Sequence, residues 1–346
     1  MGLQKYYNGT NGFHSNIKLT QESPEYASAI KNDKKIQEAI KKGFDGKYKI
    51  KRMPRLGSMA AFTAVKPING EDFDIDRGLV IDPESAPDNP VTIKKELKAI
   101  LKNYGFSEPV IKKPCVTADY KSKQLHIDYV VFKDGNVNTE LAVGKEHSGE
   151  SERKWDPNDT EGLLKWLRWE GEGKTSEFTN QYFRIVRYLK RWRDFNYKNE
   201  SDRKKVFSIS FAVMAREQFV EGVDAQGMRD DHSCLIGVLE RILVECRYFY
   251  PQGEKKYHIN VKLPKEPYRD IYIKKSKDTG TKLFNRLTTM LSKLKDVNDL
   301  ETMKEKTEAL QKLFGDGFPV ADDDSKNSNG RLQTVGASLS RVSDGA

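Results

Sequence analysis

The sequence predicts an α+β protein, in which a mixed β-sheet with flanking helices comes first and an α-helical lobe follows. Two observations predict this fold class. Short runs rich in β-branched and aromatic residues, separated by turn signals, occupy residues 73–143. From residue 160 onward, apolar residues recur with helical spacing instead. A length of 346 residues accommodates one large domain or two of ordinary size.

The elements of the first part follow from local signals. An amphipathic helix is expected over residues 22–44, where apolar residues repeat on one face. A short segment over 59–65 and a turn at Asn69-Gly70 come next. Beyond this turn the sequence predicts one helix and four strands, with a hairpin turn at Asp134-Gly135 before the last strand: helix 91–104 and strands 73–81, 110–118, 124–132 and 137–143.

The second part is expected to be helical throughout, either as a separate domain or as a lobe packed on the sheet. Its helices are predicted over residues 163–169, 178–197, 206–220, 233–249, 283–294 and 300–314. The chain therefore divides into residues 1–158, which hold the sheet and the N-terminal helix, and residues 159–318, which hold the helical lobe. Residues 319–346 are polar and low in complexity, and we expect them to be disordered.

Three aspartates carry the chemistry that the sequence predicts. Asp74 and Asp76 lie two residues apart in one apolar run, so a strand places them on the same face. Asp128 lies in a second apolar run and needs charge compensation for the same reason. Three converging carboxylates form a cage for two Mg²⁺ ions, which can clamp the attacking and leaving oxygens of a phosphoryl transfer. This pattern favours an enzyme that transfers nucleotides.

Other interpretations of these residues stay open. Three solvent-exposed strand aspartates are the simpler alternative, and Asp72 shares a face with Asp74 and Asp76. Gly57-Ser58 offers backbone N–H groups and a hydroxyl to a phosphate, but Gly-Ser is also a common loop pair. A solvated helix face equally explains the basic run around Arg187.

The composition limits the classes of protein. The net charge of +9 favours a polyanionic partner, and a nucleoside triphosphate satisfies that as well as nucleic acid does. The cysteines Cys115, Cys234 and Cys246 are scattered, which excludes a zinc module with closely spaced ligand pairs. No apolar run is long enough to span a bilayer, and no signal-peptide core is seen, so a cytoplasmic location is expected.

The order Gly57-Ser58, then Asp74-Ile75-Asp76, then His126-Ile127-Asp128 resembles the polymerase-β-type nucleotidyltransferase superfamily. More narrowly, the stretches that carry the likeness resemble the DncV-like subgroup of the bacterial CD-NTases, the cGAS/DncV-like nucleotidyltransferases of CBASS antiphage defence. These stretches are residues 57–67, 74–78, 188–194, 207–210 and 313–319. The resemblance thus extends over nearly the whole chain up to Pro319.

The resemblance implies a polymerase-β-like sheet, a helical lobe like that of oligoadenylate synthetases, and an active site in the cleft between them. It implies that Asp74, Asp76 and Asp128 hold two Mg²⁺ ions, with Mn²⁺ as a substitute. Gly57 and Ser58 would contact the β- and γ-phosphates. In the helical lobe, Lys190 and Ser208 are similar to the family's triphosphate contacts. Arg187 lies one helical turn before Lys190, so its charge could substitute for that of Lys190.

The function that the resemblance implies is the joining of NTPs, ATP among them, into a cyclic di- or trinucleotide second messenger with release of pyrophosphate. The product alone would reach a downstream effector, and neither a membrane nor a nucleic-acid activator is indicated. Two alternatives remain: a linear oligonucleotide synthetase or RNA-tailing enzyme, and a non-catalytic nucleotide-binding scaffold. Some CBASS enzymes resemble ubiquitin-like substrates, so an E1/E2-like ligase acting on the tail at Gly345-Ala346 is a further candidate partner, beside an ordinary disordered tail.

Overall fold

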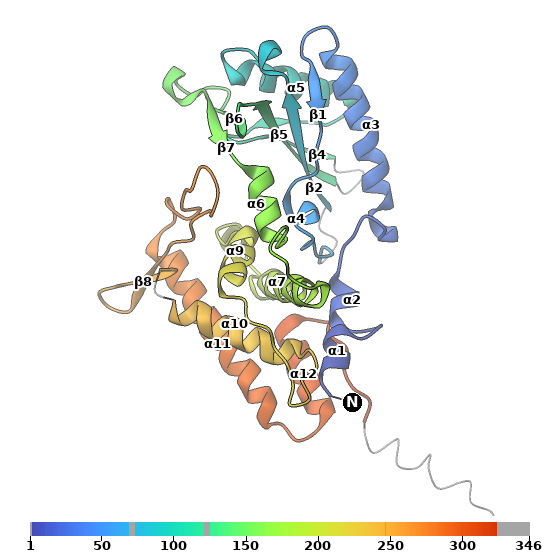
Figure 1. The fold of residues 1–346 in the computed structure, drawn as a ribbon, viewed down its shortest axis with the longest axis vertical. Helices are drawn as coiled ribbons and strands as arrows, with labels where there is room; N and C mark the ends of the chain where they lie inside the picture. Colours follow the sequence, from blue (N-terminus) through green and yellow to red (C-terminus); the bar gives the residue numbers. More distant parts are fainter. Residues whose placement is uncertain (1, 69–72, 121–124, 246, 324–346) are drawn as a thin grey trace, which may run out of the picture.

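The computed structural model describes residues 2–68, 73–120, 125–245 and 247–323. It places a β-sheet lobe at one end of an elongated molecule and a helical lobe at the other, with helix α6 (Thr160–Leu167) leading from one to the other (Figure 1). The predicted α+β fold class is confirmed. The expected cleft between the lobes and the predicted domain boundaries at residues 158 and 318 stay predictions.

The sheet is mixed, as expected. Its main order is β1-β2-β5-β4-β3, and β6 pairs with both β5 and β7. Strands β2 and β5 are parallel neighbours, whereas the other strand pairs of the described part of this sheet are antiparallel. The strands are β1 Ile50–Arg52, β2 Phe73–Ile81, β3 Val110–Ile111, β4 Val116–Tyr120, β5 Leu125–Asp134, β6 Thr139–Val143 and β7 Lys154–Asn158.

Two helices cover the apolar face of the sheet. Helices α3 (Ala27–Phe44) and α5 (Pro90–Tyr104) bury Ile36, Ile40, Ile93 and Leu97 against the inward-facing side chains of β2 and β5. Asn89 caps α5 through its side chain, and Gly105 ends it in the left-handed conformation that glycine favours. The face of β2 that bears Asp74 and Asp76 is therefore the one turned away from this core.

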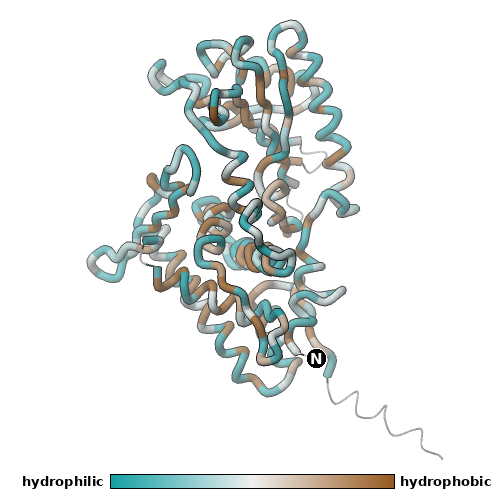
Figure 2. The backbone as a smooth tube through the Cα atoms, viewed as in Figure 1, coloured by the Kyte–Doolittle hydropathy of each residue, from teal (hydrophilic) through white to brown (hydrophobic). Residues whose placement is uncertain are grey.

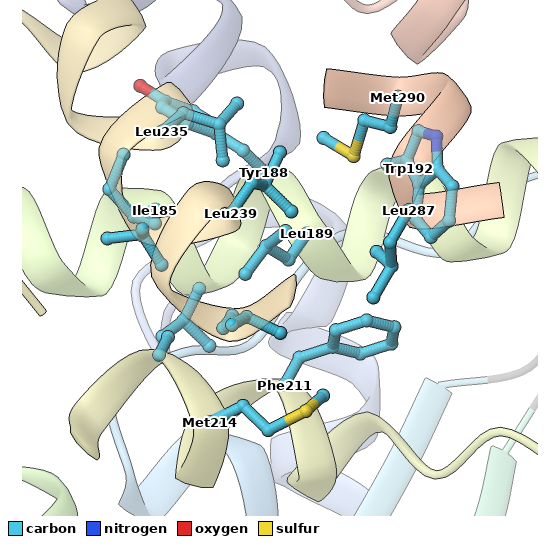
Figure 3. Close-up of a cluster of buried hydrophobic side chains, with 14 of the residues drawn as sticks. Ile185, Tyr188, Leu189, Trp192, Phe211, Met214, Leu235, Leu239, Leu287 and Met290 are labelled. Atoms are coloured by element: carbon cyan, nitrogen blue, oxygen red, sulfur yellow. The ribbon is translucent and has the colours of Figure 1, made fainter. Parts of the chain in front are cut away.

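The helical lobe is built around α7 (Ser176–Asn196), whose side chains are buried on nearly every side. Figure 3 shows Tyr188, Leu189 and Trp192 of α7 among apolar side chains of α9, α10 and α11. Figure 2 shows hydrophobic residues gathered where these helices meet. The remaining elements of the lobe are α8 Glu200–Arg203, α9 Ser208–Gln218, α10 Asp231–Val244, β8 Phe249–Gln252, β9 Lys256–Ile259, α11 Lys277–Asp299 and α12 Met303–Phe314.

The N-terminal helices pack on the helical lobe and not on the sheet. Helices α1 (Gln4–Asn8) and α2 (Phe13–Ile17) contribute Tyr7, Phe13 and Ile17 to the core of that lobe. The segment that follows α2 then pairs with the chain before β2, because Lys18 forms a bridge with Val65. The first residues of the chain thus connect both lobes.

Several local predictions need correction. The strand expected over 110–118 is two strands, β3 and β4, joined by a tight turn, and the helix expected over 233–249 ends at Val244 before strand β8. Strands β1, β7 and β9 and helices α1 and α2 were not predicted, because each is five residues or shorter and shows little periodicity. The predicted turn at Asn69-Gly70, the candidate Asp72 and Cys246 lie outside the described residues.

The first residues of the tail that was predicted to be disordered are structured. Residues 319–323 are described, Ala321 is buried, and its backbone N–H donates to Thr307 Oγ1 of α12 at 2.9 Å. The candidate ligase site at Gly345-Ala346 lies outside the described residues. Among the helices of the described ranges, none combines the length and apolar composition that crossing a bilayer requires.

Candidate active site

Strands β2 and β5 bring the three predicted aspartates together. In their parallel register, Asp76 lies opposite Asp128, and Asp74 lies opposite His126. Because residues i and i+2 of a strand share a face, all four side chains project from the same side of the sheet. The register therefore places carboxyl groups from two distant parts of the chain side by side.

The electrostatics of Asp74 and Asp76 indicate that their charges are poorly compensated. Burial, followed by the negative charges of Asp74 and Asp128, raises the pKa of Asp76 to about 7. The Asp74 residue is exposed overall. Protein atoms nevertheless displace water from around its carboxyl group, and this desolvation raises the pKa of Asp74 above its usual value. A cation bound between the two carboxylates would remove the cost of crowding like charges.

Asp128 differs, because its own neighbours stabilise its charge. Its Oδ1 accepts a hydrogen bond from Thr117 Oγ1 and another from Cys115 Sγ at 3.5 Å, while Oδ2 lies 3.8 Å from His126 Nε2. Burial alone would raise the pKa of Asp128, but His126 and Thr117 outweigh burial and hold this pKa below its usual value. Interaction with Asp128 and then with Asp119 raises the pKa of His126 to about 9, so His126 carries a positive charge at neutral pH.

The predicted phosphate-binding pair lies directly beside this cluster. Gly57 has φ +59°, begins the one-turn helix α4 (Gly57–Ala60) and lies so close to Asp76 that a Cβ atom on residue 57 would overlap the Asp76 carboxyl group. The Leu56 N–H donates to the Asp76 carbonyl at 2.9 Å, which fixes the distance between turn and strand. The structure thus brings Gly57 and Ser58 next to the aspartates.

The three predicted residues of the helical lobe occupy different positions. Lys190 is buried, and its Nζ donates to Thr63 O at 3.1 Å and to Thr63 Oγ1 at 2.8 Å. Arg187 is also buried, and its guanidinium contacts backbone carbonyls of the segment after Ser58. Ser208 is the first residue of α9, a helix whose N-terminus has no side-chain cap. Their roles as triphosphate contacts stay predictions.

Electrostatic interactions connect the helical lobe to the aspartates. The charge of Lys190 lowers the pKa of Asp76, and in turn burial, Arg193 and Arg187 lower the pKa of Lys190 to about 7. Arg193 and Asp194, at the end of α7, act on the pKa of Asp74 with opposite signs. The C-terminal half of α7 therefore faces the end of the sheet where the aspartates lie.

Sequence reasoning missed the residues around Asp128. His126, Thr117 and Cys115 act on Asp128 directly, and Lys112 Nζ lies 4.0 Å from its Oδ1. The spacing of His126 and Asp128 is a signal that could have revealed His126, because the two must share a strand face. Thr117 and Cys115 could not be found without the β4–β5 register, which pairs Thr117 with Asp128.

The donor set at this end of the sheet suits Mg²⁺. All three candidate ligands are carboxylates, which Mg²⁺ prefers, and burial raises the pKa values of Asp74 and Asp76. Within the described ranges, the side chains as placed do not form a group of three or more metal ligands. The two-Mg²⁺ cage of three carboxylates therefore stays a prediction.

Comparison with known proteins places the fold. Residues 52–132 match the family described as "Cyclic GMP-AMP synthase DncV-like, nucleotidyltransferase domain". Vibrio cholerae DncV in its GTP-bound form superposes with a TM-score of 0.69 at 16% identity, covering 91% of this chain and 95% of that one. The Bradyrhizobium diazoefficiens CD-NTase CdnG in complex with GTP gives a TM-score of 0.63 at 18% identity, covering 88% and 93%.

A third structure, V. cholerae DncV cyclic AMP-GMP synthase with the linear intermediate 5′ pppA(3′,5′)pG, gives a TM-score of 0.64 at 15% identity and covers 91% of this chain and 96% of that one. No curated protein matches the sequence significantly. The sequence match lies over the strands that bear all three aspartates and over the Gly57-Ser58 turn. Residues 52–132 therefore match a DncV-like nucleotidyltransferase domain, and the fold of the chain is similar to that of DncV.

Proposed function

We propose that this protein is a Mg²⁺-dependent nucleotidyltransferase that joins NTPs, ATP among them, into a cyclic di- or trinucleotide second messenger for CBASS antiphage signalling. The observation that carries the proposal is the β2–β5 register, which sets Asp76 opposite Asp128 with Asp74 beside them and Gly57-Ser58 against them. The likeness to DncV and CdnG structures with bound GTP supports a nucleotide substrate.

Each residue has a defined role in this proposal. Asp74, Asp76 and Asp128 would hold the metal, while Gly57 and Ser58 would hold the β- and γ-phosphates. Asp128 lies where it can orient the attacking ribose hydroxyl and accept its proton. Lys190 and Ser208 supply triphosphate contacts from the helical lobe. When bound, Mg²⁺ would neutralise charge that develops on the phosphates.

The reaction needs positioning more than covalent help from the protein. A ribose hydroxyl oxygen of one nucleotide forms a bond to the α-phosphorus of another, the bond between the α- and β-phosphates breaks, and pyrophosphate leaves. The same step, repeated within the linear product, closes the ring. Asp128 is suited to the base role, since His126 and Thr117 keep its carboxyl group ionised.

The test is incubation of the full chain with all four NTPs and Mg²⁺, without nucleic acid, followed by mass spectrometry. A phosphatase-resistant cyclic product is expected. A linear product that phosphatase degrades would favour the oligonucleotide synthetase, and a requirement for RNA would favour the tailing enzyme. NTP binding by calorimetry without turnover would favour the scaffold.

Asp76→Asn tests whether synthesis depends on the aspartates, and Asp156→Asn is its matched control. We expect Asp76→Asn to abolish synthesis while the free energy of unfolding stays equal or rises, because the amide removes one of three crowded negative charges. Asp156→Asn makes the same chemical change on β7, where the half-exposed Asp156 pairs with Lys154 at 2.6 Å. It should leave synthesis intact. Substantial turnover by Asp76→Asn would contradict the assignment of this site.

A further inference from the structure

The segment that follows Ser58 is bound to the helical lobe through its own main chain. Cationic side chains of α7, and one residue that follows α6, donate to five of its carbonyl oxygens. The contacts are Arg168 Nη1 to Ala60 O at 3.2 Å, Arg187 Nη2 to Phe62 O at 2.5 Å, Lys190 Nζ to Thr63 O at 3.1 Å, Arg187 Nε to Ala64 O at 3.1 Å and Arg191 Nη2 to Lys66 O at 2.8 Å. Hydrogen bonds from charged donors are stronger than neutral ones, so this set holds the segment firmly.

The turn at the centre of this segment has a conformation that its sequence disfavours. The Phe62 N–H donates to Met59 O at 3.3 Å and the Thr63 N–H donates to Ser58 O at 2.9 Å, the two bonds that define a Schellman motif at the end of α4. The residue at the position of Phe62 must be left-handed, and Phe62 has φ +57°. Glycine usually occupies this position, so outside contacts must hold Phe62 there. One of the two bonds ends on Ser58 itself.

Arg187 makes the contacts that hold the turn. It binds the carbonyls on both sides of Thr63, and its Nη1 lies 3.1 Å from His14 Nε2 on α2. Burial, then Arg187, lowers the pKa of His14 to about 3, so the ring is neutral and its Nε2 accepts from the guanidinium. All three nitrogens of Arg187 thus have protein partners, and the residue is only 5% exposed.

Lys190 provides the contrast on the same helix face. Its ammonium has three N–H donors, and its hydrogen bonds to Thr63 O and Thr63 Oγ1 use two. Its charge also acts on Asp76. Within the described part of the chain, Lys190 therefore keeps one N–H donor beside the aspartates, whereas Arg187 points into the protein.

We propose that Arg187 is a positioning residue, which fixes the strained turn at Phe62 and thereby the place of Ser58, and that it does not contact the triphosphate. The sequence alone suggested the opposite role. The effect on turnover rests on the proposed nucleotidyltransferase function, while the effect on the turn does not. Only the planar fork of arginine reaches two carbonyls and a ring nitrogen together, so lysine is a poor replacement here.

The first experiment measures the turn directly, by hydrogen exchange of the full chain without nucleotide. Arg187→Met is expected to make the amides of Phe62 and Thr63 exchange about tenfold faster, because their local opening becomes easier. Arg286→Met is the matched control, since Arg286 also donates to a backbone carbonyl, Asn196 O at 2.7 Å, but lies in α11. It should leave exchange in residues 57–66 unchanged. Unchanged exchange in Arg187→Met would overturn the proposal.

The second experiment is a double-mutant cycle between Arg187 and Ser58 on turnover. We expect Arg187→Met to lower kcat about 100-fold with a small change in KM, as misplacement of a contact does. In that background Ser58→Ala should have little further effect, because the hydroxyl is already displaced. Additive losses, or a rise in KM for NTP alone, would instead identify a direct phosphate contact and refute the positioning role.

Arg187→Lys is the second variant, and it tests the proposal even if Arg187→Met does not fold. It keeps the charge and one donor nitrogen in place of three, so it should fold and show intermediate exchange and intermediate kcat. Full activity in Arg187→Lys would contradict the proposal, since charge alone would then suffice. An inactive wild-type chain would count against the proposed function, and the exchange experiment would still decide whether Arg187 holds the turn.

Discussion

Gly57 lies directly against the carboxyl group of Asp76, and this contact leaves no room for a side chain on residue 57. The backbone of Gly57 is also left-handed, with φ +59°. Residue 57 must therefore be glycine for two separate reasons. Its backbone conformation disfavours a Cβ atom, and the Asp76 carboxyl group occupies the space that a Cβ atom would need. The second reason concerns the site, because it is Asp76 that must move.

Gly57→Ala should abolish or strongly reduce synthesis, since the new methyl group displaces the Asp76 carboxyl group or the turn. Gly46→Ala is the matched control, because Gly46 has φ +73° and a Cβ atom added there would meet no described atom within 4 Å. Gly46→Ala should lower the unfolding free energy by only about 1 kcal/mol, the cost of placing a residue with a Cβ atom in a left-handed conformation. Chemical denaturation and turnover assays on both variants separate strain from displacement. Equal behaviour of the two would show that the contact with Asp76 is unimportant.

Thr117→Val removes the hydroxyl that donates to Asp128 Oδ1 while keeping the shape of the side chain. A hydrogen bond to a charged group contributes about 1.5–3 kcal/mol, so we expect kcat to fall at least about tenfold. Thr139→Val is a suitable control, because Thr139 donates to the Asn158 carbonyl at 3.0 Å between β6 and β7. Unaltered turnover in Thr117→Val would exclude a role for this bond in holding Asp128.

Lys94→Met should destabilise the sheet lobe by about 3 kcal/mol, because buried carbonyls lose a charged donor. Lys94 is fully buried in α5, and its Nζ lies 2.8–3.4 Å from the carbonyl oxygens of Lys112, Lys113, Ala142 and Gly144. Lys98→Met, one turn along the same helix, removes a half-exposed ion pair with Glu146 and should cost less than about 1 kcal/mol. Urea denaturation measures both; similar losses would contradict the prediction.

The same lysine predicts a pH dependence of stability. Burial lowers the pKa of Lys94 from its usual 10.5 to about 8, with an opposing effect of Cys115. Between these two values the unfolded chain binds a proton that the folded chain does not, so the unfolding free energy should rise with pH from about 8 to 10.5. The difference between wild type and Lys94→Met, measured across this range, isolates Lys94. A difference that is flat with pH would disagree with the lowered pKa.

Tyr7→Ala should cost about 4 kcal/mol of unfolding free energy, as the loss of a buried aromatic ring does. Tyr7 is fully buried, its ring lies 5.4 Å from that of Tyr188, and its hydroxyl lies 2.9 Å from His232 Nδ1. Tyr6→Ala, at the neighbouring half-buried position, should cost much less. Thermal unfolding compares the two. A loss for Tyr7→Ala as small as that for Tyr6→Ala would show that Tyr7 is not part of the core of the helical lobe.

Much of the architecture could be predicted because it depends on local patterns. Apolar periodicity revealed α3, α5, α7, α11 and α12 within a few residues of their observed ends or centres, and short apolar runs between turn signals revealed β2 and β5. The Asp74-Ile75-Asp76 and His126-Ile127-Asp128 spacings were enough to place the aspartates on strands. Their meeting required only that the two strands be neighbours in register, which they are.

The rest depends on contacts between distant residues, which no local pattern encodes. The sequence of α7 does not reveal whether its basic side chains bind a nucleotide or backbone carbonyl oxygens. The role of Arg187 therefore could not be assigned without the position of residues 62–64. Likewise, Thr117 stabilises Asp128 only because β4 joins β5 in a particular register. Short elements such as α1 and β1 carry too few residues for periodicity to show.

The attachment of residues 60–66 to α7 has a consequence for biosynthesis. As the polypeptide leaves the ribosome, the strands bearing Asp76 and Asp128 emerge before Arg187 and Lys190 are translated. The nascent sheet can pair, but the turn after Ser58 lacks the side chains that hold it until α7 has appeared. A prematurely released fragment would therefore bear every aspartate and still lack the side chains of α7 that hold the turn after Ser58.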